Sequence, residues 1–260
     1  MARPLIIGHR GASAVAPENT LAAFARAVSD GADGIEFDVR LSHDKVPVVI
    51  HDARLWRTAR LACSVSDLSS RELSSIKVGS WFNRKFPRVA RTEYEEETIP
   101  TLKSVFDFFS TSKGVLYLEM KCEASACDAL AQGCVELIQN YSLAQRTLVE
   151  CFYLPAITQV KRLDPRMQTV ALFEPRFKQP ISLFNRIAMV EKARDCGADE
   201  IAMHHTLIAP RVVAKARQLN MPCVVWTVDH PRWVRRAASL GLKALITNNP
   251  ARMVQASNVD

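Results

Sequence analysis

The sequence predicts an α/β barrel, in which eight parallel strands alternate with helices and form a single domain. Its 260 residues are the usual length of one such barrel. Short apolar runs alternate with amphipathic stretches along most of the chain, which indicates repeated β/α units. Some apolar runs contain no polar residue, as in Cys223-Val224-Val225, and such runs are typical of parallel strands that are covered on both faces.

The first β/α unit shows the pattern. An apolar run over residues 5–8 leads into His9, and Gly11 and Pro17 then turn the chain. A helix begins near Asn19-Thr20. In barrels built from such units, the chemistry gathers at the carboxyl ends of the strands, where His9 would lie.

A hairpin follows the second strand. Apolar runs over residues 34–41 and 46–50 flank a polar turn at residues 42–45. If residue 41 pairs with residue 46, the register places Glu36 opposite His51, and strand alternation puts Asp38 on the same face. Two carboxylates so close together need a cation or a proton between them, and we expect a divalent metal ion.

Residues 53–99 interrupt the alternation. They contain many serines, a basic stretch and an acidic stretch, together with large apolar residues such as Trp56, Trp81 and Phe82. The segment is too long for a plain loop in a compact barrel. We expect a small inserted subdomain beside the mouth of the site, in a single domain that covers residues 1–260.

The alternation resumes at Pro100, and Glu119 ends the next strand in a position equivalent to those of His9 and Glu36. A third carboxylate there completes an oxygen-rich site that suits Mg²⁺ or Ca²⁺. The expected elements are helix 102–109, strand 115–120, helix 124–141, strand 147–152, helix 155–163, strand 169–173, helix 187–196, strand 200–203, helix 210–219, strand 223–228, helix 232–240 and strand 244–247.

Seven short motifs follow one another in this chain: His9-Arg10-Gly11, Pro17-Glu18-Asn19-Thr20, Glu36-x-Asp38-Val39, Val48-Val49-Ile50-His51-Asp52, Ile99-Pro100-Thr101-Leu102, Leu118-Glu119-Met120-Lys121 and Trp226-Thr227-Val228. In this order and spacing they resemble the glycerophosphodiester phosphodiesterase family over nearly the whole chain. The resemblance implies a TIM barrel with a small insertion, and hydrolysis of small-molecule glycerophosphodiesters to sn-glycerol 3-phosphate and an alcohol.

The resemblance also implies roles for individual residues. Glu36, Asp38 and Glu119 would bind one divalent metal ion, Mg²⁺ or Ca²⁺. His9 and His51 would be the catalytic acid and base, because a phosphodiester needs one group to deprotonate the nucleophile and another to protonate the leaving alcohol. The reaction would pass through a cyclic phosphate made by the substrate's own neighbouring hydroxyl. The sequence does not say which histidine is the acid.

Arg10 and Lys121 are the expected contacts to the substrate phosphate. Arg10 offers a planar, bidentate fork, and Lys121 offers a point charge on the same side of the strand end as Glu119. A second interpretation is that Arg10 anchors the turn at Glu18-Asn19, which we expect to be mainly structural.

Two further residues have open interpretations. Trp226 ends a late strand, so it would either form an apolar wall of the substrate pocket or belong to the packed core. Asp52 would either orient His51 or pair with the inserted segment.

The sequence departs from the family pattern at three places. Glu150-Cys151-Phe152-Tyr153 stands where Ser-Phe-Asn is common, Thr247-Asn248-Asn249-Pro250 replaces Thr-Asp-x-Pro, and Ser42-x-Asp44 replaces Thr-x-Asp. None of these changes removes an expected ligand or histidine, so they affect the expected substrate preference and leave the expected activity in place. We interpret Cys151 as an inert, buried thiol.

The composition limits the classes of molecule that the protein is expected to bind. The formal net charge of +7 fits an anionic substrate, but no nucleic-acid-binding motif accompanies it. Seven scattered cysteines without a C-x-x-C pair fit free thiols. With no signal-peptide pattern and no run long enough to span a bilayer, we expect a cytoplasmic protein without stable membrane insertion; its oligomeric state is left open.

Two alternatives remain at this stage. The first is a lysophospholipase D-like or sphingomyelinase D-like enzyme that acts on lipid substrates, which a long apolar groove beside the inserted segment would favour. The second is a barrel that binds phosphodiesters without turning them over.

Overall fold

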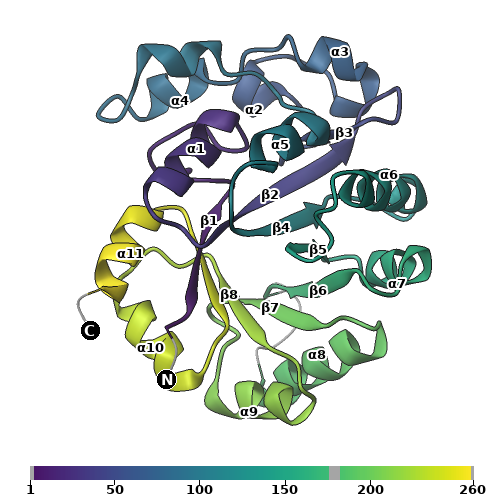
Figure 1. Cartoon of the computed structure of the whole chain (residues 1–260), viewed down its shortest axis with the longest axis vertical. Coiled ribbons are helices and arrows are strands. Elements are labelled where there is room, and N and C mark those ends of the chain that lie inside the picture. The colour runs from purple at the N-terminus through teal and green to yellow at the C-terminus, as the bar shows by residue number, and fades with distance from the viewer. Residues whose placement is uncertain (1–2, 176–181, 259–260) are drawn as a thin grey trace.

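The computed structural model describes residues 3–175 and 182–258, and in it the strands form a closed barrel surrounded by helices (Figure 1). The sheet order β1-β9-β8-β7-β6-β5-β4-β2 is closed by pairing of β1 with β2, and these eight strands are all parallel. The expected TIM barrel is confirmed. The strands are β1 (Leu5–His9), β2 (Gly34–Leu41), β3 (Pro47–Val49), β4 (Val115–Met120), β5 (Thr147–Cys151), β6 (Gln168–Phe173), β7 (Glu200–His204), β8 (Cys223–Trp226) and β9 (Ala244–Thr247).

The outer helices follow from local signals in the sequence. Thr20 caps the first helix by accepting a hydrogen bond from the backbone N–H of Ala23, and proline occupies the first turn of three others. The helix over 250–257 was not expected, but it completes the last β/α unit. The barrel helices are α1 (Leu21–Ser29), α5 (Leu102–Phe109), α6 (Cys127–Asn140), α7 (Leu154–Leu163), α8 (Leu183–Asp195), α9 (Pro210–Gln218), α10 (Arg232–Leu240) and α11 (Pro250–Ser257).

The core has two parts. One lies between the strands and the outer helices, where Phe24 and Phe109 pack with their ring centroids 6.1 Å apart. The other fills the barrel interior with Tyr117, Val170 and Val224, among others. Because this interior is packed with side chains, the only room for a ligand inside the barrel is at its ends.

Between β3 and α5 the chain forms five short helices, which lie at one end of the molecule with α2, α3 and α4 at the top of the view (Figure 1). One apolar cluster joins this segment to Val48 and Ile50, and an aromatic cluster around Phe82 joins it to Ala23 of α1. The helices are α2 (Trp56–Ala59), η1 (Val65–Asp67), α3 (Ser70–Leu73), α4 (Ser80–Lys85) and η2 (Thr92–Glu96).

The predicted register of the hairpin is wrong by one residue. Leu41 pairs with Pro47, and the pairing ends at Val49. The turn contains one more residue than expected, because the Ser42 hydroxyl bonds both backbone groups of Val46, at 2.9 and 3.0 Å, and Lys45 adopts a positive φ of 61°. His51 therefore lies beyond the strand, and its position depends on the loop instead of a cross-strand pair with Glu36.

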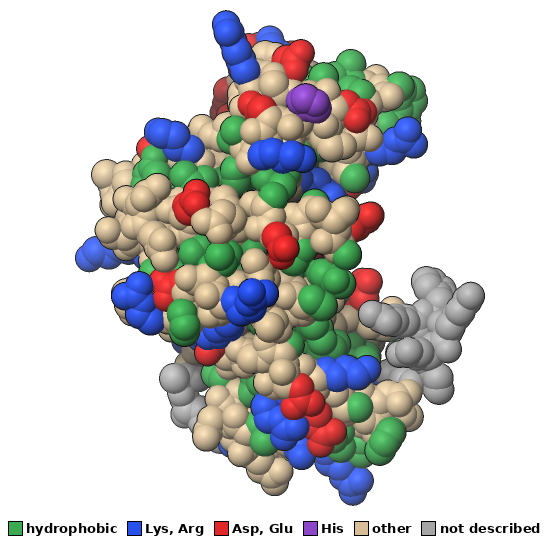
Figure 2. All heavy atoms as spheres, turned by 90° about the vertical axis from the view of Figure 1, so that its right-hand side faces the viewer, with side chains coloured by type: hydrophobic (Ala, Val, Ile, Leu, Met, Phe, Trp, Pro, Cys, Tyr) green, Lys and Arg blue, Asp and Glu red, His purple; other side chains and the backbone are tan. Residues whose placement is uncertain are grey.

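On the face that Figure 2 shows, Lys and Arg side chains alternate with Asp and Glu side chains instead of forming one basic patch. The net charge of +7 is thus not concentrated on this side of the molecule. Within residues 3–175 and 182–258, no helix combines the length and the apolar character that crossing a membrane requires.

Candidate active site

A cavity of about 260 Å³ opens at the carboxyl ends of the barrel strands. Of the residues predicted to bind metal or substrate or to move protons, all line it except Asp38, which is fully buried and contacts the lining residues Arg10 and Lys121. The lining consists of His9, Arg10, Glu36, His51, Glu119, Lys121, Glu150, Phe152, Leu172, Glu174, Trp226 and Ile246. The sequence therefore identified most of the polar groups of one cavity.

Three carboxylates meet at this cavity, two of them in its lining. Glu36 and Asp38 share one face of β2, and the parallel register sets Asp38 beside Glu119 of β4. One oxygen from each residue lies within 4.8 Å of the others, and all three side chains are buried. Hard, negatively charged oxygens at this spacing fit a divalent cation such as Mg²⁺ or Ca²⁺.

The three carboxylates have different pKa values because their surroundings differ. Burial and then the charges of Asp38 and Glu119 raise the pKa of Glu36 well above its ordinary value, and burial raises the pKa of Glu119 to about 7. Burial acts in the same direction on Asp38, but Arg10 and Lys121 outweigh it and hold its pKa low. A divalent cation among these groups would relieve the repulsion that raises the first two pKa values.

Lys121 and Arg10 flank the carboxylates. Lys121 Nζ lies 2.6 Å from Glu119 Oε1 and 3.1 Å from Asp38 Oδ1. Arg10 has a positive φ of 52°, and its guanidinium contacts Glu18 at 2.9 Å and Asp38 at 3.1 Å. Both interpretations of Arg10 are therefore compatible with the structure, because the same side chain anchors the Glu18 turn and lines the cavity.

His9 is held between two elements of the barrel. Its Nδ1 lies 2.7 Å from Asn248 Oδ1, and its Nε2 lies 3.8 Å from Glu36 Oε2. Burial and then the charge of Arg10 lower the pKa of His9 to about 4, although the hydrogen bond with Asn248 acts in the opposite direction. A histidine in these surroundings is neutral at physiological pH.

His51 is held by the chain that follows it. Its Nδ1 lies 2.7 Å from Asp52 Oδ1, and Arg57 Nε of α2 donates to the other oxygen of Asp52 at 2.5 Å. Arg57 also forms two hydrogen bonds with Glu18, at 2.7 and 2.8 Å. Both interpretations of Asp52 are thus compatible with the structure, since it contacts His51 and also Arg57 of residues 53–99.

One wall of the cavity is apolar. Trp226 packs edge-on against Phe152, with ring centroids 5.5 Å apart, and Leu172 and Ile246 lie beside them. Trp226 therefore belongs both to the cavity wall and to the packed barrel interior. The indole Nε1 of Trp226 is buried and has no hydrogen-bond partner among the residues that the structure describes.

Comparisons with known proteins identify the family. Residues 9–252 match the Glycerophosphoryl diester phosphodiesterase family. This chain belongs to that family. The Bacillus subtilis protein YhdW is similar at 30% identity over 94% of each chain, and the glycerophosphodiester phosphodiesterase of Caldanaerobacter subterraneus is similar at 28% identity over 97% of each chain.

A solved structure supports the same assignment. An Oleispira antarctica phosphodiesterase, whose structure was solved in complex with the product sn-glycerol-3-phosphate, is similar with a TM-score of 0.84 and 25% identity over 98% of this chain and 97% of that one. The glycerophosphodiester phosphodiesterase of Thermotoga maritima is similar with a TM-score of 0.75 and 25% identity over 98% of this chain and 99% of that one. The phosphodiesterase family and its barrel are therefore established for this chain by sequence and by structure.

The sequence assigned no role to several residues that line or support the site of this phosphodiesterase family member. Glu150 is buried in the cavity, and its Oε2 has no hydrogen-bond partner in the described part of the chain. Its position at a strand end next to Glu119 was the available signal. Asn248, which the sequence marked only as a departure from the family pattern, contacts His9 from the far end of the chain, and Arg57, within residues 53–99, contacts Asp52. Cys151 is buried as expected, and its thiol donates to the Met120 carbonyl at 3.0 Å.

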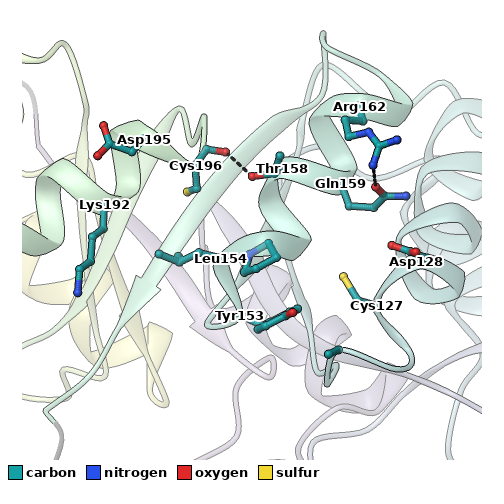
Figure 3. Close-up of a pocket in the computed structure, with 12 residues that line it drawn as sticks. Cys127, Asp128, Tyr153, Leu154, Thr158, Gln159, Arg162, Lys192, Asp195 and Cys196 are labelled. Carbon is teal, nitrogen blue, oxygen red and sulfur yellow. Dashed lines mark hydrogen bonds between the residues drawn. The ribbon is translucent and has the colours of Figure 1, made fainter.

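A larger hollow, of about 690 Å³, lies outside the barrel among α6, α7 and α8 (Figure 3). Its lining mixes Arg162 and Lys192 with Asp128 and Asp195, and the polar groups in it bond to one another, as when Thr158 donates to the Cys196 carbonyl at 3.1 Å. It contains neither the three carboxylates nor the two histidines. The smaller cavity, at the strand ends, is therefore the candidate active site of this phosphodiesterase.

Proposed function

We propose that the protein is a metal-dependent glycerophosphodiester phosphodiesterase, which hydrolyses glycerophosphodiesters to sn-glycerol 3-phosphate and an alcohol. The observation that carries this proposal is the cluster of Glu36, Asp38 and Glu119 at a cavity that two histidines also line. Family membership supports it, and so does the relative from Oleispira antarctica whose structure was solved in complex with sn-glycerol-3-phosphate.

The three carboxylates would hold one divalent metal ion, Mg²⁺ or Ca²⁺. The ion would supply positive charge to offset the negative charge that develops on the phosphoryl oxygens. Arg10 and Lys121, which lie beside the carboxylates, would bind the substrate phosphate and orient the phosphorus for attack.

His9 and His51 would move the protons. As an oxygen of the substrate's neighbouring hydroxyl forms a bond to phosphorus, one imidazole takes its proton. The bond from phosphorus to the alcohol breaks, and the other imidazole protonates the departing oxygen. Water then opens the resulting cyclic phosphate with the two proton transfers reversed, which returns both histidines to their starting states.

The alcohol half of the substrate would lie against Trp226 and Phe152, near the inserted segment. We infer that residues 53–99 are an insertion in a single-domain chain and that they restrict which alcohol enters, because Arg57 of this segment reaches the histidine site through Asp52. A cavity of about 260 Å³ suits headgroup-sized diesters more than lipids.

A panel of diesters tests the proposal. Purified protein is incubated with glycerophosphoethanolamine, glycerophosphocholine, glycerophosphoglycerol and a lysophospholipid, with and without a chelator, and sn-glycerol 3-phosphate is measured by a coupled assay. We expect release from at least one deacylated diester, loss of release with chelator, and recovery on adding Mg²⁺ or Ca²⁺. Turnover of the lysophospholipid alone would contradict the substrate class, and no turnover of any diester would contradict the function.

A further inference from the structure

The two ring nitrogens of His9 face different surroundings. Nδ1 lies 2.7 Å from Asn248 Oδ1, and Nε2 points to the side of Glu36, 3.8 Å from its Oε2. Asn248 follows the last barrel strand, so it is 239 residues from His9 in the sequence. Which nitrogen of a neutral histidine carries the hydrogen depends on what the partner atom can accept or donate.

Asp229 fixes the orientation of the Asn248 amide. One oxygen of Asp229 accepts the Asn248 backbone N–H at 2.8 Å, and the other oxygen accepts the side-chain Nδ2 at 2.8 Å. A carboxylate can only accept, so an Asn248 amide turned the other way would place two acceptor oxygens against each other. The amide oxygen therefore faces His9.

Two hydroxyl groups complete this network. The Ser13 hydroxyl donates to Asn248 Oδ1 at 2.9 Å, and the Thr247 hydroxyl donates to Asp229 at 2.9 Å. Because Asn248 Oδ1 only accepts hydrogen bonds, His9 Nδ1 must carry the hydrogen. The lone pair of a neutral His9 is then on Nε2, the nitrogen that faces the carboxylates of the cavity.

We propose that Asn248, oriented by Asp229 and Ser13, is a positioning residue that holds His9 with its hydrogen on Nδ1, so that Nε2 takes the proton of the attacking hydroxyl. This inference rests on the proposed function, and it assigns His9 as the general base and His51 as the general acid. The oxygen–phosphorus bond forms as the proton moves to His9 Nε2. The bond to the leaving alcohol breaks, and the departing oxygen takes a proton from His51. Asp52 suits this second role, because a carboxylate at Nδ1 stabilises a charged imidazole more strongly than a neutral amide does.

The experiment combines ring nitrogen NMR with a comparison of leaving groups in the metal-loaded protein. The His9 signal is assigned by its loss in His9→Asn. Nitrophenolate leaves without needing a proton. With nitrophenyl glycerophosphate, the loss of a general acid therefore changes the rate little, whereas the loss of a general base still lowers it. Asn248→Ala should lower kcat about 10- to 100-fold with both nitrophenyl and ethanolamine leaving groups, with little change in KM, and should populate the Nε2–H form of His9.

A swap of the two side chains provides the second variant. Asn248→Asp alone sets a carboxylate against Asp229, and Asp229→Asn alone removes the acceptor that orients the amide. In the double variant, the carboxylate at position 248 accepts a hydrogen bond from His9. The amide at position 229 donates to the other oxygen of that carboxylate. We expect each single variant to lose rate, and the double variant to recover to within about 3-fold of wild type and to return the Nδ1–H form.

Asn249→Ala is the matched control, because Asn249 caps α11 and accepts the Arg252 backbone N–H at 3.2 Å. It should lower the Tm while leaving the tautomer of His9 unchanged. An Nε2–H form in wild type, or an Asn248→Ala protein with unchanged tautomer and kcat, would overturn the inference. A loss confined to the ethanolamine leaving group would also overturn it, since the network would then serve the acid. If wild type turned over no diester, the proposed function would fail, and the tautomer measurement would still decide the role of Asn248.

Discussion

The two histidines of the cavity are held in opposite ways. His9 ends strand β1. Its partner Asn248 comes from the other end of the chain, directly after β9, which pairs with β1. His51 lies past the end of β3, and its partner is the next residue, Asp52. Residues next to the barrel strands thus hold the first histidine, whereas the segment of short helices between β3 and α5 contacts the partner of the second through Arg57.

This difference has chemical and mechanical consequences. The partner of His9 is an uncharged amide directly after a barrel strand, and the partner of His51 is a carboxylate bonded to Arg57 of a short helix. Arg57 joins Asp52 to Glu18, which in turn contacts Arg10. A change in the inserted segment should therefore reach His51 and Arg10 while leaving His9 in place, and substitutions on the two sides should differ in their effects.

The largest effect should come from the three carboxylates that lie beside both histidines. We expect Glu36→Gln to abolish metal-dependent turnover and to weaken metal binding by more than about 100-fold, because it removes a charge from the only set of three carboxylates that the described residues bring together. Calorimetric titration with Mg²⁺ and Ca²⁺ measures the affinity. Metal affinity equal to that of wild type would show that the ion is bound elsewhere.

His51→Ala should keep metal affinity and lower kcat by about 100- to 10,000-fold, since it removes the proposed proton donor without removing a carboxylate. His43→Ala is a matched control, because His43 is an exposed histidine in the hairpin turn. It should retain nearly the wild-type rate. A His51→Ala enzyme with a near-normal rate would contradict the assignment of His51.

Arg57→Ala tests the connection between the inserted segment and the site. We expect kcat to fall about 10-fold and the free energy of unfolding to fall by about 1 kcal/mol, because the variant loses bonds to Asp52 and Glu18 that are partly exposed. Arg54→Ala, an exposed arginine on the same segment, should change neither quantity. Steady-state kinetics and denaturant unfolding measure both. Equal effects of the two variants would show that the Arg57 contacts do not transmit to His51.

The smallest expected effect is on the pH dependence of stability, through the hydrogen bond between His51 and Asp52. The hydrogen bond from His51, and then that from Arg57, hold the pKa of Asp52 below its ordinary value, against partial burial. A lowered carboxyl pKa stabilises the fold above the unfolded pKa, near 4, and this contribution is lost as the pH falls through the folded pKa. Asp52→Asn should therefore cost about 1 kcal/mol at pH 7, and the difference from wild type should shrink below about pH 4. A difference that grew on acidification would contradict the pairing.

The sequence predicted the strands closely but not every loop. Each expected strand is present with its ends within two residues of the prediction, because unbroken apolar runs between turn signals leave few alternatives. The hairpin register was wrong by one residue, since the hydroxyl of Ser42 and the backbone of Lys45 lengthen the turn and neither effect is visible in apolar alternation. The helix over 250–257 was not predicted either. Its apolar pattern is short and begins immediately after the last strand.

By itself the sequence determined the barrel and the group of side chains at its carboxyl end. Strand alternation puts Glu36 and Asp38 on one face, and the parallel β/α order brings Glu119 and His9 to the same end. Only the tertiary structure decided how the histidines are held, because those contacts join residues that no local pattern relates. Asn248 reaches His9 across 239 residues, and its amide is oriented by Asp229, so closure of the sheet determines which nitrogen faces the cavity.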